Sequence, residues 1–140
     1  MAVTKQELYD FIRARKFAVL ATVHARGGPE AALVGIAVTP DLELIFDTTD
    51  ATRKYANLEA DPRIAFVIGW DKEVTLQYEG VADEPQGEEL ARLKEIYFGT
   101  FPEGVNRQDW PGLTYFRVKP RWIRFSNYYR PRRIDEMTFG

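Results

Sequence analysis

The sequence contains no cysteine and a single histidine, His24, among its 140 residues. Without cysteine the chain has no disulfide bond, thiolate metal site, iron–sulfur cluster or cysteine nucleophile. One imidazole leaves little for a histidine-rich metal centre or a histidine-based catalytic triad. His24 is the last residue of an expected strand, where it is predicted to make an ordinary hydrogen bond. The composition therefore disfavours metal-dependent and serine-hydrolase chemistry.

Long apolar segments are also missing. No apolar run approaches the ~20 residues of a membrane-spanning helix, and residues 1–16 carry interspersed charges instead of the apolar core of a signal peptide. The formal net charge is −2, so bulk electrostatics indicate no polyanionic partner. These features predict a cytoplasmic protein whose partners include neither a membrane nor a nucleic acid.

The length predicts one domain, residues 1–140, because a chain of this size buries roughly two-thirds of its unfolded surface and no linker or repeat divides it. Thr4 and Glu7 form a capping-box pattern ahead of apolar residues at helical spacing, which predicts an amphipathic helix over residues 4–15. A second amphipathic helix is predicted over residues 86–98, with Gly99 as its C-terminal stop.

Runs rich in β-branched and aromatic residues, separated by glycine and proline turns, predict the strands. Their expected ranges are 17–24, 31–38, 42–47, 63–70, 73–82, 113–118 and 122–127. Residues 99–112 are predicted to form a loop, residues 119–121 a turn, and residues 128–140 an irregular tail. The chain is thus expected to be mainly β (α+β), a six- to seven-stranded antiparallel barrel with peripheral helices at its connections.

Two cations, Arg53 and Lys54, fall where the expected strand 42–47 runs into a short helix that ends at Asp61-Pro62. The positive end of the helix macrodipole makes cations unfavourable there by roughly 0.3–1 kcal/mol each. A phosphate bound to the free N–H groups of the first turn would reverse that sign. The alternative is a pair of solvated surface residues, paired with Asp50 or Glu59.

The order of several motifs resembles the FMN-binding split barrel of the pyridoxamine 5′-phosphate oxidase-like superfamily. The resemblance covers roughly residues 5–125. The segments that carry it are Leu20-Ala21-Thr22-Val23, the turn Gly28-Pro29, Leu44-Ile45-Phe46-Asp47-Thr48, Thr52-Arg53-Lys54, and Asn57-Leu58-Glu59-Ala60-Asp61-Pro62-Arg63-Ile64-Ala65.

This resemblance implies FMN as the cofactor, bound at the subunit interface of a homodimer. The cofactor-binding residues that follow from it are Ala32, Leu33, Val34, Gly35, Ile36, Asp47, Thr48, Thr49, Arg53 and Lys54. Either Thr75 or Gln77 is placed against the polar edge of the flavin. Trp110, in the expected loop, is a candidate for stacking on the ring or for packing in the core or interface. Gly35 marks either a bulge or a close approach of the ring to the backbone.

Departures from the oxidase pattern bear on the reaction. Where the oxidase has an arginine and a lysine at the ends of the cofactor-binding strand, this chain has Ala32 and Ala37. Where the oxidase has a tryptophan and then a histidine-containing substrate motif near its C-terminus, this chain has Ser126 and then Arg133-Ile134-Asp135-Glu136-Met137. Oxidation of pyridoxamine phosphate itself is therefore not expected.

The sequence thus predicts an FMN-dependent oxidoreductase of unassigned substrate, without a catalytic side chain, because electron transfer belongs to the flavin. One alternative is a reductase that uses the deazaflavin F420, whose phosphate would need the same cations. Another is a flavin-binding or flavin-storing protein without activity. Heme binding is a more distant alternative, because His24 is the one imidazole available.

Overall fold

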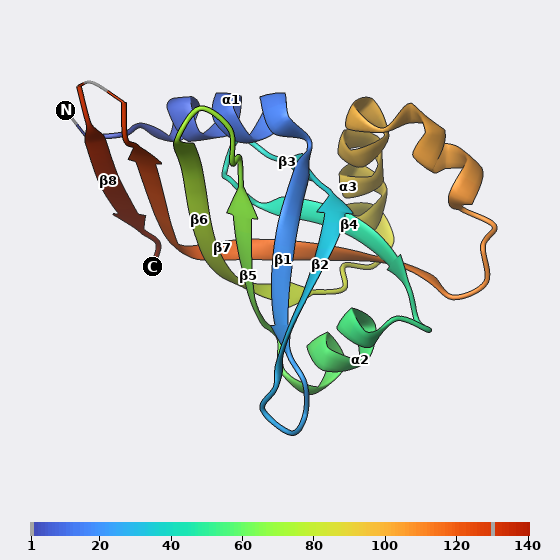
Figure 1. The fold of residues 1–140 in the computed structure, drawn as a ribbon. Helices are drawn as coiled ribbons and strands as arrows, with labels where there is room; N and C mark the ends of the chain where they lie inside the picture. Colours follow the sequence, from blue (N-terminus) through green and yellow to red (C-terminus); the bar gives the residue numbers. More distant parts are fainter. Residues whose placement is uncertain (1, 130) are drawn as a thin grey trace.

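A computed structural model of the chain describes residues 2–129 and 131–140, and these form a single curled antiparallel sheet with helices at its connections (Figure 1). The strand order is β2-β1-β5-β6-β7-β4-β3, with β8 paired to β7. The strands are β1 Phe17–Val23, β2 Pro29–Gly35, β3 Ala37–Val38, β4 Leu44–Thr49, β5 Arg63–Ile68, β6 Val74–Asp83, β7 Leu113–Asn127 and β8 Arg133–Thr138. The helices are α1 Lys5–Arg15, α2 Arg53–Ala60 and α3 Gly87–Thr100, followed by a 3-10 helix, η1 Pro102–Arg107.

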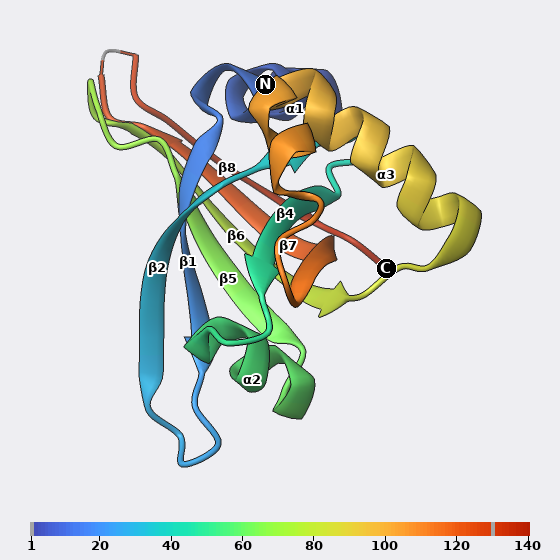
Figure 2. The same cartoon turned by 90° about the vertical axis from the view of Figure 1, so that its right-hand side faces the viewer.

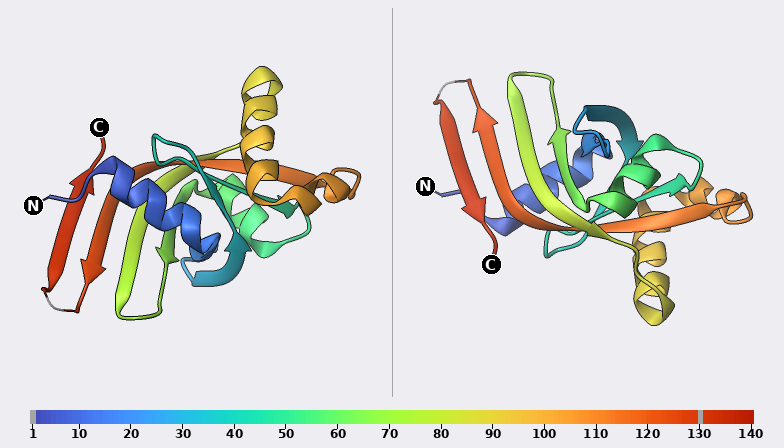
Figure 3. Two further views of the ribbon diagram at one scale, coloured as in Figure 1. Left: turned by 90° about the horizontal axis from the view of Figure 1, so that it is seen from above. Right: turned by 90° about the horizontal axis from the view of Figure 1, so that it is seen from below.

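The predicted fold class is confirmed, since the sheet curls into a split barrel with peripheral helices. In Figure 2, α1 and α2 lie at the two ends of the curl and α3 lies beside β4 and β7. Leu8 of α1 and Leu58 of α2 pack in the core inside the curl, whereas Leu93 of α3 packs with Ile45 and Tyr115 on the outer face of β4 and β7. Seen from above and below, α1 crosses one end of the curl (Figure 3). Among the described residues no helix is both long and apolar enough to cross a membrane.

Helix α1 begins as predicted. The Thr4 side chain accepts a hydrogen bond from the backbone N–H of Glu7 at 3.1 Å, and the Glu7 carboxylate accepts one from the backbone N–H of Thr4 at 3.1 Å. This reciprocal capping box satisfies two of the N–H groups that a helix start leaves free. Leu8 and Ile12 then bury their side chains in the barrel core.

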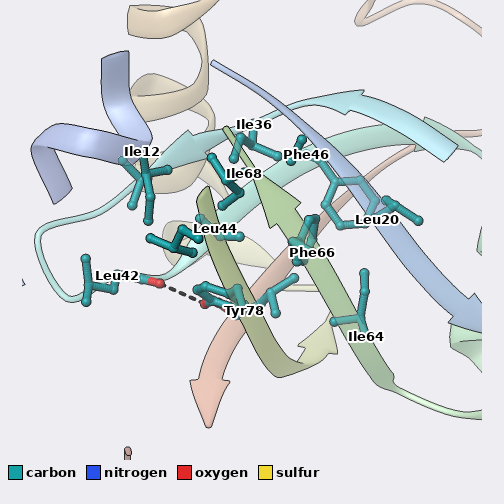
Figure 4. Close-up of a cluster of buried hydrophobic side chains, with 14 of the residues drawn as sticks. Ile12, Leu20, Ile36, Leu42, Leu44, Phe46, Ile64, Phe66, Ile68 and Tyr78 are labelled. Atoms are coloured by element: carbon teal, nitrogen blue, oxygen red, sulfur yellow. Dashed lines mark hydrogen bonds between the residues drawn. The ribbon is translucent and has the colours of Figure 1, made fainter. Parts of the chain in front are cut away.

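The core lies within the curl of the sheet, where apolar residues from α1 and from most strands meet (Figure 4). Phe46 stacks on Phe116 at a centroid distance of 5.5 Å and meets the edge of Phe66 at 6.2 Å. The hydroxyl of buried Tyr78 donates to the backbone carbonyl of Leu42 at 2.8 Å. Burial raises the pKa of the Tyr78 hydroxyl well above its usual value, so it remains a hydrogen-bond donor.

The predicted turn at residues 119–121 is wrong, because β7 runs unbroken from Leu113 to Asn127. Glu79 pairs with Trp122 and Gly80 with Pro120, which makes Arg121 the extra residue of a β-bulge. At Gly80 an added Cβ would lie 2.5 Å from the carbonyl oxygen of Lys119, so the backbones approach too closely there for any side chain. The proline sits at the bulge, a place in a sheet that tolerates a missing N–H.

Two other boundaries differ from the prediction. Helix α3 continues through Gly99 to Thr100, and η1 occupies part of the expected loop. The expected irregular tail contains β8, which pairs with the end of β7 and adds a strand to the six or seven expected. The Trp122 indole N–H donates to the Glu136 carboxylate at 2.7 Å across this pairing. Long-range pairing therefore orders a segment whose own sequence has no strong strand period.

Candidate functional site

The start of α2 is fixed by a small network of threonine hydroxyls. The Thr52 side chain caps the helix by accepting from the backbone N–H of Tyr55 at 3.4 Å, and its hydroxyl donates to the carbonyl of Thr49 at 3.0 Å. Thr48 lies 2.9 Å from Thr52, oxygen to oxygen, and must donate, since the Thr52 hydrogen points at Thr49. The strand β4 and the helix are thus held in one geometry at their junction.

Arg53 and Lys54 occupy the first turn of α2, as predicted. The Arg53 side chain is 76% exposed, whereas Lys54 is partly buried. This burial lowers the pKa of the Lys54 ammonium group, and the nearby negative charge of Asp47, which raises that pKa, offsets only part of the shift. No acidic residue stands in the first turn to offset the positive end of the helix. Two cations and the helix N-terminus therefore create a positive field at one point.

That field lies in a pocket of about 280 Å³ between α2 and the strands β1 and β2. Its lining combines apolar and small side chains with the polar start of the helix, namely Leu20, Thr22, Glu30, Ala31, Ala32, Thr52, Arg53 and Lys54. Ala32 is one of the residues predicted to meet a flavin. The structure thus brings three of the predicted site residues, Ala32, Arg53 and Lys54, together around one pocket.

The predicted partners of Arg53, Asp50 or Glu59, are wrong. Its guanidinium instead pairs with the Glu30 carboxylate, with Nη1 and Oε2 3.0 Å apart. The other Glu30 oxygen accepts from the side-chain amide of buried Asn57 at 2.8 Å, and the same amide nitrogen donates to the Thr22 hydroxyl at 2.9 Å. Sequence reasoning missed Glu30 and Asn57. The signal available for Asn57 is its spacing of four residues from Arg53, which places both on one helix face.

Asp47 and Trp110 both lie beside Arg107 of η1, on the face of β4 that α3 covers. Asp47 forms an ion pair with Arg107, whose Nη2 lies 3.2 Å from the carboxylate, and the Arg107 guanidinium carbon lies 5.9 Å from the centre of the Trp110 ring. Burial and the charge of Asp47 raise the pKa of the neighbouring Tyr97 hydroxyl. Because side chains alternate along a strand, Asp47 faces away from Thr48. The Trp110 ring is 53% exposed.

The predicted cofactor strand is divided. Ala32, Leu33, Val34 and Gly35 belong to β2, the last strand at one end of the described sheet, while Ile36 lies between β2 and β3. An edge strand presents one row of backbone groups away from the sheet. At Gly35 the close neighbour is the ring of Phe101, since an added Cβ would lie 2.7 Å from Phe101 Cζ. This close approach explains the glycine without a bulge in β2.

Comparisons with known proteins support the same fold and place the chain in a family. The family model described as "Pyridoxamine 5'-phosphate oxidase" matches residues 4–127. The chain belongs to this family. The pyridoxine/pyridoxamine 5'-phosphate oxidase of Rubrobacter xylanophilus is 32% identical over 128 residues, which cover 86% of this chain and 57% of that protein. The enzyme of the same description from Bordetella pertussis is 33% identical over 92 residues, 65% of this chain and 42% of its own length. The chain thus spans about half the length of these curated relatives.

Solved structures of related fold carry varied descriptions. A heme binding protein from Mycobacterium smegmatis matches with a TM-score of 0.84 and 22% identity, covering 99% of this chain and 59% of that chain. The heme storage protein HutZ from Vibrio cholerae matches with a TM-score of 0.74 and 20% identity, covering 86% of this chain and 92% of that chain. A putative pyridoxamine 5'-phosphate oxidase from Listeria innocua matches with a TM-score of 0.72 and 18% identity, covering 86% of this chain and 96% of that chain. At these identities the likeness establishes the split-barrel fold.

Within one chain of this oxidase family member, Thr75 and Gln77 are not near the basic pocket. Gln77 faces the convex side of the sheet, and Thr75 lines a separate pocket of about 350 Å³ beside Trp70 and Tyr128. Since β1 and β5 separate β6 from β2, the strand spacing alone puts β6 roughly 14 Å away. One protomer therefore does not assemble the whole predicted residue set.

The single histidine takes the place expected for it. His24 follows the end of β1, is exposed, and accepts a hydrogen bond at Nδ1 from the backbone N–H of Arg26 at 3.0 Å. Among the described residues no group of three or more histidine, cysteine or acidic side chains is arranged to hold a metal ion. The basic pocket at the start of α2 is thus the candidate site that the geometry supports best.

Proposed function

We propose that the chain binds FMN at the basic pocket and acts as a flavin-dependent oxidoreductase. The observation that carries this proposal is the pair of cations, Arg53 and Lys54, at the N-terminus of α2 inside a pocket walled by β2. A phosphate there would accept hydrogen bonds from the free backbone N–H groups of the first turn and charge-assisted hydrogen bonds from both cations. The residues present therefore fit the phosphate end of FMN.

The protein's part in this scheme is binding and orientation. Arg53 and Lys54 neutralise the phosphate, while the hydroxyls of Thr48 and Thr52 hold the first helical turn in place. The free backbone row of β2, from Ala32 to Gly35, offers hydrogen bonds to the polar edge of a planar ring. When bound, the flavin supplies the hydride or electron transfer. No side chain is assigned as an acid or a base.

A homodimer completes the proposed site. Exposed apolar side chains gather on the convex face of the sheet, where Leu33 is 65% and Val67 is 40% exposed. Thr75 and Gln77 belong to the same sheet, on β6. A second copy packed on this face would cover the apolar side chains and bring a partner's β6 toward the flavin. The dimer is part of the proposal and has its own test.

Replacing Leu33 and Val67 together by aspartate is expected to convert the dimer to a monomer, because four carboxylates would be buried without partners in the dimer interface. Light scattering after size-exclusion chromatography measures the mass directly. The matched control is Val105→Asp, which places a charge at a 47% exposed valine on η1. A wild-type mass equal to that of one chain would remove the dimer from the proposal.

The substrate is not proposed to be pyridoxamine phosphate. Ser126, at the position of the oxidase's tryptophan, is 2% exposed. Arg133, the residue that matches the first arginine of the oxidase's substrate motif, is already held by Glu7 at 2.9 Å and Asp135 at 2.7 Å. An arginine that serves two carboxylates is poorly placed to bind a substrate phosphate. The proposed oxidoreductase activity is therefore directed at a substrate other than pyridoxamine phosphate.

The visible absorption spectrum of the purified protein, with identification of the released chromophore, tests the proposed function. The two visible bands of oxidised flavin and release of FMN are the expected result. Anaerobic addition of NADH or NADPH should then bleach those bands if the protein is an oxidoreductase, whereas a flavin that stays oxidised indicates storage. A colourless protein that binds only added deazaflavin, or one with the Soret band of heme, would contradict FMN as the cofactor.

A further inference from the structure

A carboxylate stands inside the pocket that is proposed to bind a phosphate. Glu30 projects from β2 into the lining, opposite Arg53 and Lys54, and its side chain is 18% exposed. A carboxylate at an anion site opposes binding, since like charges a few ångströms apart repel strongly in a partly desolvated pocket. This placement calls for a physical explanation beyond the pairing with Arg53.

Glu30 is held in place by a buried amide. Asn57 is 3% exposed, and its side-chain nitrogen donates one hydrogen to Glu30 at 2.8 Å and the other to Thr22 at 2.9 Å. If the carboxylate rotated out of the pocket, a buried N–H would lose its acceptor, which is costly. Arg53, by contrast, is 76% exposed and free to turn toward a ligand. The carboxylate therefore stays in the pocket when an anion enters.

The charges that face the pocket can be counted. Its lining contributes two cations, Arg53 and Lys54, and one carboxylate, Glu30. Asp47 is close enough to influence Lys54, but its own charge is paired with Arg107 on the other side of β4. The side chains thus leave a net charge near +1. Because Coulomb repulsion scales with the charge of the ligand, Glu30 opposes a doubly charged group about twice as strongly as a singly charged one.

We propose that Glu30 is a specificity-determining residue, which shifts the preference of the pocket away from a phosphate monoester and toward a phosphodiester of the same ring system. A monoester carries nearly two negative charges above its second pKa of about 6, whereas a diester carries one. The inference rests on the proposed function, because it assigns a charge preference to the same pocket.

Two flavins that differ in this charge, and in whether the phosphate is closed onto the 4′-oxygen, provide the test: FMN and riboflavin 4′,5′-cyclic phosphate. Their dissociation constants are measured by calorimetry at pH 8 with flavin-free protein. The ratio of the two dissociation constants in the wild-type chain is the reference. The ring closure is the same in every variant, so comparing the ratio between variants isolates the charge of Glu30. In Glu30→Gln, which keeps an oxygen for Asn57, the ratio of affinities should shift toward FMN by about tenfold, as expected for removing one charge near the phosphate.

Two further variants complete the test. Glu88→Gln, which removes a charge from the exposed first turn of α3, should leave the ratio at its wild-type value, and an equal shift there would overturn the proposal. Glu30→Ala repeats the test should the glutamine variant not fold. An unchanged ratio in a folded Glu30 variant overturns the inference alone. Failure of the wild type to bind either flavin would instead remove the proposed function, and the inference with it.

Discussion

Replacing Arg53 and Lys54 together by alanine is expected to weaken FMN binding at least about a hundredfold. Two charge-assisted hydrogen bonds to the phosphate are lost, at roughly 1.5–3 kcal/mol each. The fold should not suffer, because both cations stand at the positive end of α2, where each is unfavourable by about 0.3–1 kcal/mol. The ion pair with Glu30 is also lost, but Arg53 is largely exposed and such pairs contribute little.

The measurement is FMN affinity alongside urea unfolding of the flavin-free protein. A loss of affinity with unchanged or slightly higher stability is the signature of a ligand site. The matched control is Arg13→Ala with Lys119→Ala, which removes the same charges from exposed positions on α1 and β7. Equal FMN affinity in the double variant and the wild type would show that the phosphate binds elsewhere.

The start of α2 could be predicted because its determinants are local. Strand residues lead into Thr52, a preferred capping residue, and Asp61-Pro62 ends the helix after its eight residues, Arg53–Ala60. These signals lie within one short segment, so their outcome depends little on the rest of the fold. The same holds for the capping box of Thr4 and Glu7. Local rules thus predicted both helix starts to within a residue.

The segment 113–127 shows the limit of such rules. Lys119-Pro120-Arg121 has the composition of a turn, yet the chain continues straight through it as one strand. The deciding contacts come from β6, where Gly80 allows the close backbone approach that a bulge needs. A glycine some forty positions earlier in the sequence therefore decides the conformation at Pro120. No window of neighbouring residues contains that information.

The site was predicted in the same uneven way. The position of the two cations in the helix was enough to indicate them. Glu30, the carboxylate that faces them, was missed because it comes from a distant strand: it is 27 positions from Asn57, the helix residue that holds it. Asp47 and the next residue, Thr48, were both predicted to bind the cofactor. Because side chains alternate along a strand, Asp47 instead points to the opposite face and pairs with Arg107. Adjacent residues of a strand lie on opposite faces of the sheet. A continuous sequence motif in a strand therefore includes residues from both faces, and only one face can line a given site.

Replacing Phe46 by alanine is expected to lower the free energy of unfolding by about 3–5 kcal/mol, the usual cost of emptying a fully buried aromatic site. Phe46 is 0% exposed and contacts Phe66 and Phe116, and Tyr55 of α2 packs on Phe116 at 6.0 Å. The cavity should therefore also loosen α2 and weaken FMN binding. Urea unfolding at one fixed protein concentration measures the stability, with Tyr129→Ala at a 54% exposed ring as the control. A loss below about 1 kcal/mol would mean that the core closes around the gap, and α2 would then keep its place and its affinity.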